Sequence, residues 1–203
     1  MIVSATIIES LYYILKKIGK ADKLKLILLL HLSDKYSLTH YGRTITGDVY
    51  YATNLCIVGK NTKDILNFDF SVSKDYFLNL IEKVENYNFK AKEKDIPFNM
   101  LSETDKEALD FVIKKFGNMS SSELVELTHK YPEWEQYKDK IVKRECVDTI
   151  EILSTIENDP LESSKEHIEF IKEMLLDKLI DRIHNIENNK DVEIYGTADE
   201  LFK

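Results

Sequence analysis

The sequence predicts a mainly α fold of the α+β class: a helical domain with a small antiparallel β-sheet or hairpin, and a C-terminal helical hairpin. Its 203 residues include only 6 glycines and 3 prolines, which favours long helices over a many-turned sandwich or barrel. Apolar residues recur at helical spacing in several segments. One stretch, residues 43–53, is instead rich in β-branched and aromatic residues, which are typical of strands.

Two helices are predicted at the N-terminus. Residues 7–18 carry isoleucines and leucines every three or four positions, and Gly19 follows them as a stop. Residues 22–40 form the second helix, which has apolar residues on every side, so we expect it to be buried in the centre of a bundle. Gly42 is expected to end it in the left-handed conformation.

The middle of the chain predicts the β structure. Residues 43–53 form a strand or short hairpin with a bend at Gly47-Asp48. Residues 74–86 form a short helix, and the alternating stretch that starts at Tyr87 forms a second strand. Residues 54–72 are mixed in character and predict no definite element.

Three Ser-x-x-acid patterns predict helix starts in the second half. They pair Ser102 with Asp105, Ser120 with Glu123 and Ser163 with Glu166. The first helix is expected to end at Gly117 and the second before Pro132.

We expect a long helix from about Trp134 to Ile156, followed by the helix that the third pattern opens. Together they predict an antiparallel helical hairpin. The domain organisation is then a core over residues 1–135, the hairpin over 136–187 and a polar, loose tail over 188–203.

Charge is unevenly distributed. The net charge is −8, but residues 1–98 hold 14 basic and 11 acidic residues, whereas residues 99–203 hold 14 and 25. An acidic second half disfavours a broad phosphate-binding face and suits a basic protein partner. Acidic helices that are simply solvated are the plainer alternative.

The sequence carries no targeting or membrane signal. The first residues lack a basic region and contain Glu9 within their apolar run, which is unlike a signal peptide. The apolar run around Leu28 is shorter than the roughly 20 residues of a membrane span. Cys56 and Cys146 have no metal or disulfide spacing. We therefore expect a cytoplasmic protein with reduced thiols.

No phosphate-binding, nucleotide-binding or catalytic motif is present, so chemistry would have to come from scattered side chains. His31 and Asp34 share a helix face, and with His40 they would make a metal or enzyme site. A buried His–Asp hydrogen bond is the favoured interpretation. We expect no catalysis, no metal and no cofactor.

The segment around Gly42 contains the most distinctive residues of the chain. Arg43 and Asp48 are expected to pair across the bend as a structural ion pair, with partner contact as the alternative. Nearby tyrosines are typical both of interface anchors and of core edges. Further along, His129 and Trp134 flank Pro132, and packing is the expected role of this single tryptophan.

Two ordered blocks of residues stand out along the chain. The first block consists of Tyr41, Gly42, Arg43, Ile45, Thr46, Gly47, Asp48, Tyr50 and Ala52. The second consists of Leu101, Ser102, Glu103, Leu109, Phe116, Gly117, Leu124, Leu127, Thr128, His129 and Trp134. Together they resemble the Panacea domain of the SocA-like antitoxin family of bacteria and their phages, and the resemblance covers residues 23–135.

The chain departs from the family pattern in three places. After Ala52 the family continues into a Gly-Pro-Val turn, of which only Val58 and Gly59 are matched. Pro132 lies one residue early relative to Trp134. Residues 136–203 extend beyond the shared part. The 53–62 loop and the C-terminal helices are therefore where function is expected to differ.

The resemblance implies an antitoxin that binds a cognate toxin and neutralises it, directly or as an adaptor that delivers it to a protease. It implies a mostly helical domain with a small sheet and no catalysis. The implied partner is a protein toxin, and a homodimer is an open alternative. A regulator or counter-defence factor of a phage or mobile element, which binds nucleic acid or a host protein, is the competing hypothesis. A membrane partner is not expected.

Overall fold

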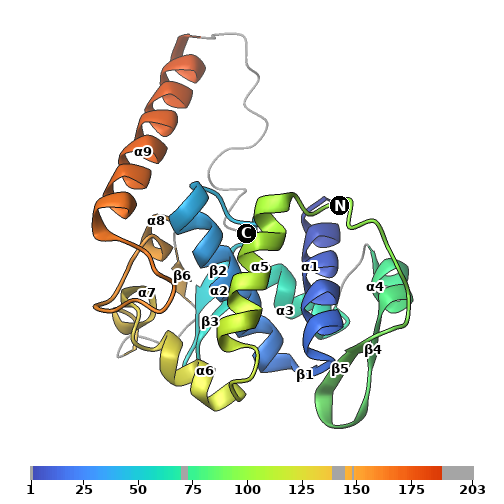
Figure 1. Cartoon of the computed structure of the whole chain (residues 1–203). Helices are drawn as coiled ribbons and strands as arrows, with labels where there is room; N and C mark the ends of the chain where they lie inside the picture. The colour runs from blue at the N-terminus through green and yellow to red at the C-terminus, as the bar shows by residue number, and fades with distance from the viewer. Residues whose placement is uncertain (1, 70–72, 139–144, 148, 189–203) are drawn as a thin grey trace.

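The computed structural model describes residues 2–69, 73–138, 145–147 and 149–188. The fold is mainly α-helical with two small antiparallel sheets, which confirms the predicted fold class (Figure 1). Helix α1, Ile2–Ile18, and helix α2, Lys23–Tyr41, are both present as predicted. Gly19 and Gly42 end them with φ values of 80° and 70°, which a residue without Cβ adopts at little cost.

Helix α2 is the centre of the fold. Its residues from Leu26 to Thr39 are all buried, the polar ones included. The Asp22 side chain accepts a hydrogen bond from the Lys25 N–H and so caps its first turn. Helices α1 and α5 and both sheets surround α2 (Figure 1). A helix that is apolar all round is buried in this way because no side of it gains from contact with water.

The two sheets are small and flank α2. The first has the order β1-β5-β4, with strands Lys20–Asp22, Asn88–Ala91 and Ile81–Lys83. The short 3-10 helix η1, Glu85–Tyr87, connects β4 to β5. The second has the order β3-β2-β6, with strands Ile57–Gly59, Tyr50–Ala52 and Glu145–Val147. Tyr51 lies in register with both Val58 and Cys146.

The predicted strand over residues 43–53 is much shorter than expected, because only Tyr50–Ala52 forms β2. Side-chain acceptors take the backbone N–H groups that precede it. The N–H groups of Ile45 and Thr46 donate to Asp34, and that of Val49 donates to Asp48. A backbone donor engaged by a carboxylate cannot also join a β-ladder.

Two of the remaining helices begin at the predicted capping boxes. The remaining helices are α3 Lys60–Leu66, α4 Lys74–Leu80, α5 Glu103–Phe116, α6 Ser121–Thr128, α7 Pro132–Glu135, α8 Thr149–Ile152 and α9 Lys165–Asn188. Ser102 and Ser120 form the predicted capping boxes. The third start is shifted by one residue, because the Ser164 hydroxyl accepts from the His167 N–H while Ser163 donates to Thr39.

The predicted helix from Trp134 to Ile156 is wrong, and so is the hairpin that it would form with α9. Residues 132–135 form the short α7, residues 145–147 form β6 against β2, and residues 149–152 form α8. Residues 139–144 and 148 lie outside the described residues. Residues 145–147 pair with β2 although the local sequence favours a helix, because tertiary contacts can override a weak intrinsic helix propensity.

A second hydrophobic cluster joins the C-terminal part to the rest. It contains Leu38, Tyr50, Ala52, Ile57, Val147, Ile152, Leu153, Ile168 and Ile171. The first four come from α2 and the second sheet, and the other five lie beyond residue 135. The first half of α9 packs on this cluster, whereas its second half projects away from the body (Figure 1). Residues up to about 175 therefore belong to the same folded body as the core.

A chain that ends at residue 135 is expected not to fold cooperatively. It loses five buried aliphatic side chains, each of which contributes roughly 1.5–3 kcal/mol, and the sum approaches a typical total stability of about 5–15 kcal/mol. A chain that ends at Lys178 retains the cluster and is the matched control. Urea unfolding followed by circular dichroism measures both. A cooperative transition of the shorter chain at the full-length midpoint would contradict the shared core.

Candidate functional site

The buried carboxylate of Asp34 organises the segment that follows α2. It accepts hydrogen bonds from the N–H groups of Ile45 and Thr46, at 2.8 and 3.0 Å, and from the hydroxyls of Thr46 and Tyr50. Burial raises the pKa of Asp34 to about 6, and these donors oppose that rise. Four donors from one loop fix the path of the chain across α2.

Arg43 pairs with Asp105 and not with Asp48, so the predicted ion pair across the bend is wrong. Its Nη1 lies 2.8 Å from Asp105 Oδ1, and its Nη2 donates to the hydroxyls of Ser102 and Thr104. Arg43 therefore joins the end of α2 to the N-terminal turn of α5. The guanidinium is half-exposed, so the ion pair contributes little to the free energy of unfolding and mainly orients the two segments.

Asp48 instead caps α3. Its carboxylate accepts from the N–H groups of Asn61 and Thr62 and from the Thr62 hydroxyl at 2.9, 2.9 and 2.7 Å. A Cβ at Gly59 would lie 2.3 Å from Asp48 Oδ2, so only glycine leaves room for this carboxylate. This one close contact accounts for the presence of both Asp48 and Gly59, two residues that match the family pattern.

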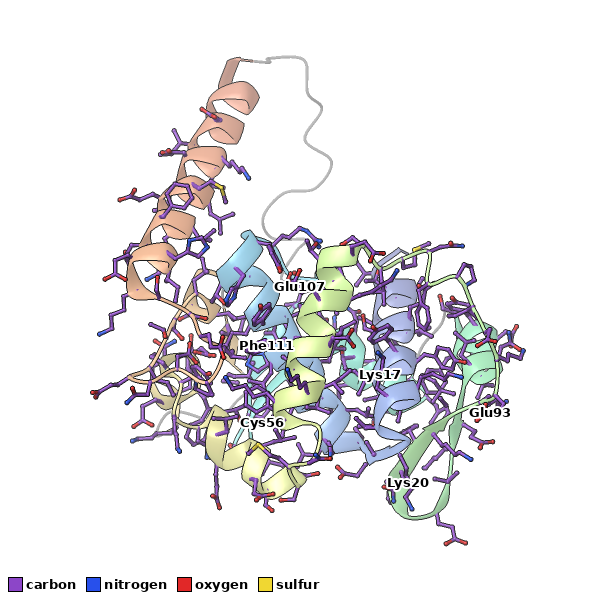
Figure 2. All side chains as sticks on the ribbon, in the orientation of Figure 1. Lys17, Lys20, Cys56, Glu93, Glu107 and Phe111 are labelled. Carbon is purple, nitrogen blue, oxygen red and sulfur yellow. The ribbon has the colours of Figure 1, made fainter. Side chains whose placement is uncertain are left out.

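The other residues of the first motif also have structural roles. Gly42 lies under α9, because a Cβ there would lie 2.7 Å from Met174 Cε. Gly47 has φ 63° at the bend. Tyr41 is half-buried next to Tyr36, and burial, followed by the neighbouring Glu107, raises its pKa to about 12. Figure 2 shows Glu107 on α5.

A buried charged cluster that the sequence did not indicate lies on α2 next to Asp34. Lys35 is fully buried and its Nζ lies 2.9 Å from Glu133 Oε1. It also donates to the Ile152 carbonyl and the Ser154 hydroxyl, at 2.7 and 2.9 Å. Burial lowers the pKa of Lys35, and the Glu133 carboxylate opposes this. The cluster ties α2 to α7 and to the segment after α8.

His31, Asp34 and His40 do not converge on one point. Asp34 is surrounded by the donors from the 45–50 segment. His31 Nε2 lies 3.8 Å from Glu133, whereas the His40 ring stacks on Tyr36 with 3.9 Å between centroids. No group of three or more metal-ligating side chains is present within the described residues. The expected hydrogen bond between His31 and Asp34 is therefore wrong: the donors to Asp34 come from the 45–50 segment, and the buried His31 Nδ1 has no hydrogen-bond partner among the described residues.

His129 and Trp134 hold the divergent loop after β2. Their rings stack with 3.5 Å between centroids. His129 Nε2 lies 2.8 Å from the Leu55 carbonyl oxygen, and Trp134 Nε1 donates to the Thr53 carbonyl at 3.1 Å. The two rings therefore not only pack on each other but also contact the backbone carbonyls of Thr53 and Leu55. The pair sets the position of residues 53–55 while remaining partly exposed itself.

Helix α9 presents an exposed acidic face, of which only Glu169 has an ion-pair partner among the described residues, Lys172 of the same helix. Its carboxylates recur every three or four residues, at Glu166, Glu169, Glu173, Asp177 and Asp181, and all are exposed. Side chains at this spacing share one face of a helix. We call this set the acidic face. Phe170 and Ile180 lie within its arc and are 59% and 50% exposed.

The arrangement separates two kinds of residue. The motif residues between Tyr41 and Tyr50 are engaged in caps, buried hydrogen bonds and close packing, which makes them determinants of the fold. The acidic face of α9 holds no other part of the described chain in place, since its Glu169 pairs only with Lys172 of the same helix, and it combines charge with exposed apolar side chains. Figure 2 shows side chains on the part of α9 that projects away from the body.

One comparison with known proteins gives a match. A model of the family described as "Antitoxin SocA-like, Panacea domain" matches residues 26–135, a little over half of the chain. Neither a curated protein nor a solved structure matches the sequence. Among the described helices, none combines the length and the apolar character needed to cross a membrane.

Gly42→Ala is expected to destabilise the protein more than Gly19→Ala. Both glycines have positive φ, which costs an alanine about 1 kcal/mol. Only at Gly42 would the new methyl also displace Met174, whereas nothing lies within 4 Å of Gly19. Thermal unfolding of both variants and a double-mutant cycle with Met174→Ala measure the difference. Equal losses for the two glycines would contradict the packing of α9 on Gly42.

Replacing His31 is expected to change how stability depends on pH. Burial, and then the nearby Lys35, lowers the pKa of His31 to about 3, whereas an unfolded histidine titrates near 6.5. The unfolded state therefore binds more protons below about pH 6.5, and this site loses about 2 kcal/mol of stability between pH 7.5 and pH 5. His31→Gln removes that loss.

Urea unfolding of wild type and His31→Gln at several pH values tests this expectation. The stability difference between the two proteins should shift by about 2 kcal/mol in favour of the variant as the pH falls to 5. Asp34 contributes in the opposite direction, because a raised carboxyl pKa adds stability as the pH falls through 6. It is present in both proteins and cancels in the comparison. Parallel stability curves would show that His31 titrates normally.

Proposed function

We infer the function of this chain from one premise: it belongs to the family of SocA-like antitoxins that carry the Panacea domain. We propose that it binds a cognate protein toxin and neutralises it. Antitoxins of this kind act by binding, which fits a non-catalytic role. The motif residues are engaged in the fold, so we assign toxin contact to a surface outside them.

The acidic face of α9 is the proposed contact surface, and it is the observation that carries the proposal. Glu169 pairs with Lys172 of the same helix, and the other four exposed carboxylates attract a basic partner and accelerate its association. Phe170 and Ile180 lie among them and provide apolar area that would be buried in the complex. The base of α9 packs on the second hydrophobic cluster, through Ile168 and Ile171, so the face is presented on a rigid support.

Reversal of charge on this face is expected to abolish neutralisation. The test variant carries Glu166→Lys, Glu173→Lys and Asp177→Lys. The control carries Glu93→Lys, Glu126→Lys and Glu157→Lys, which are exposed residues outside α9 and change the net charge equally. Each is co-expressed with the toxin-like protein encoded beside this chain, and growth is measured. The wild type and the control should restore growth, and the test variant should not.

Binding and folding measurements decide between the alternatives. Circular dichroism and thermal unfolding establish that all variants are folded. Full rescue by the α9 variant, with unchanged salt dependence of binding, would exclude this face as the contact surface. Absence of binding and rescue by the wild type would refute the antitoxin proposal and favour the regulator or counter-defence function. A toxin level that falls on co-expression would indicate delivery to a protease, and a constant level would indicate direct inhibition.

A further inference from the structure

A groove of about 950 Å³ lies on a part of the surface that the proposed function does not use. The N-terminal turn of α2, the β2–β3 hairpin and α3 form its walls, and Tyr87 of η1 reaches it from the first sheet. Its volume lies in the range of sites that bind ligands or peptide side chains. Cys56, labelled in Figure 2, is one of the lining residues.

The lining combines aliphatic residues with two tyrosines. Leu24, Ile27 and Val58 are among the lining residues, and Leu55 and Tyr87 are 50% and 70% exposed. Such exposed apolar residues beside a concave surface are typical of binding sites. His129 and Trp134 fix the backbone of the 53–55 loop. The lining is therefore ordered before any partner binds, which reduces the entropy cost of binding.

The groove carries a small excess of positive charge. Three lysines, Lys23, Lys60 and Lys63, line it together with two aspartates, Asp22 and Asp64. Burial lowers the pKa of Lys23, and the positive charge of Lys63 lowers it further, whereas Asp64 opposes this. The carboxylate of Asp22 already accepts from the Lys25 N–H and the Ser121 hydroxyl. An anionic partner would compensate these lysines, on a chain whose net charge is −8.

We propose that this groove binds a linear segment of a partner protein in which apolar side chains alternate with carboxylates. The aliphatic lining would take the apolar side chains, and the three lysines would pair with the carboxylates. Nucleic acid fits less well, because the lining residues include no arginine and two of them are aspartates, which would repel phosphate groups. The proposal is independent of toxin neutralisation by α9.

Fluorescence anisotropy with three labelled peptides tests the charge and the apolar requirement separately. The first peptide, EELFEELFEE, has both features. The second, KKLFKKLFKK, reverses the charge, and the third, EESSEESSEE, removes the apolar side chains. The full chain is expected to bind only the first peptide saturably, and added salt should weaken that binding.

Two double variants locate the site. Lys60→Ala/Lys63→Ala should weaken binding of the first peptide by roughly 5- to 30-fold, because it removes two exposed charge pairs. Lys74→Ala/Lys114→Ala removes the same charge from exposed positions outside the lining and should bind as the wild type does. Leu55→Ser should also weaken binding, through the lost apolar contact.

Three outcomes of the peptide measurements would overturn the proposal. They are absence of saturable binding of the first peptide, equal binding of the first and second peptides, and equal weakening by the two lysine variants. Competition by a short single-stranded oligonucleotide at lower concentration than the unlabelled peptide would also overturn it, in favour of a nucleic-acid site. Each result leaves the rescue experiment on α9 unaffected, so the two proposals fail separately.

Discussion

Two adjacent buried charges on α2 determine how the rest of the chain is arranged. Asp34 and Lys35 are both fully buried, and a buried charge without partners costs several kcal/mol. Asp34 obtains its donors from the segment between Ile45 and Tyr50, whereas Lys35 obtains its acceptors from Glu133, Ile152 and Ser154. Through these two side chains α2 holds in place both the segment that directly follows it and segments about a hundred residues later in the sequence. The net contribution of such contacts to stability is small, but any other path of these segments would leave a buried charge unpaired.

Local signals in the sequence were sufficient for most of the helices. Caps at Ser102 and Ser120, the positive φ of Gly42 and the all-round apolar character of α2 depend on neighbours within a few residues. The failures involve distant partners. Strand β6 exists because β2 offers it backbone hydrogen bonds, and nothing near Cys146 indicates that pairing. The same limit explains why Arg43 pairs with Asp105, sixty residues away, and not with nearby Asp48.

Sequence reasoning reached the candidate site only in part. It placed the acidic charge in the second half of the chain, and the spacing of carboxylates on α9 could be read directly. It could not indicate which face of α9 packs on Gly42, because that depends on the path of the 153–164 segment. The burial of Lys35 could not be predicted for the same reason. A lysine is expected to be exposed unless the residues that pair with it in the fold are known. The groove requires three separate segments to meet and leaves no local signal.

The boundary of the family match has a physical meaning for where specificity can arise. The match ends at residue 135, yet the second sheet and the second hydrophobic cluster are completed by residues from 145 to 171. Those residues are thus required by the fold and limited in how far they can change. Beyond about residue 175, α9 leaves the body, and Leu176, Leu179 and Ile180 are about half exposed. A substitution there alters the available surface without loss of buried core, so partner choice can change at this end while Asp34 and Lys35 keep the scaffold constant.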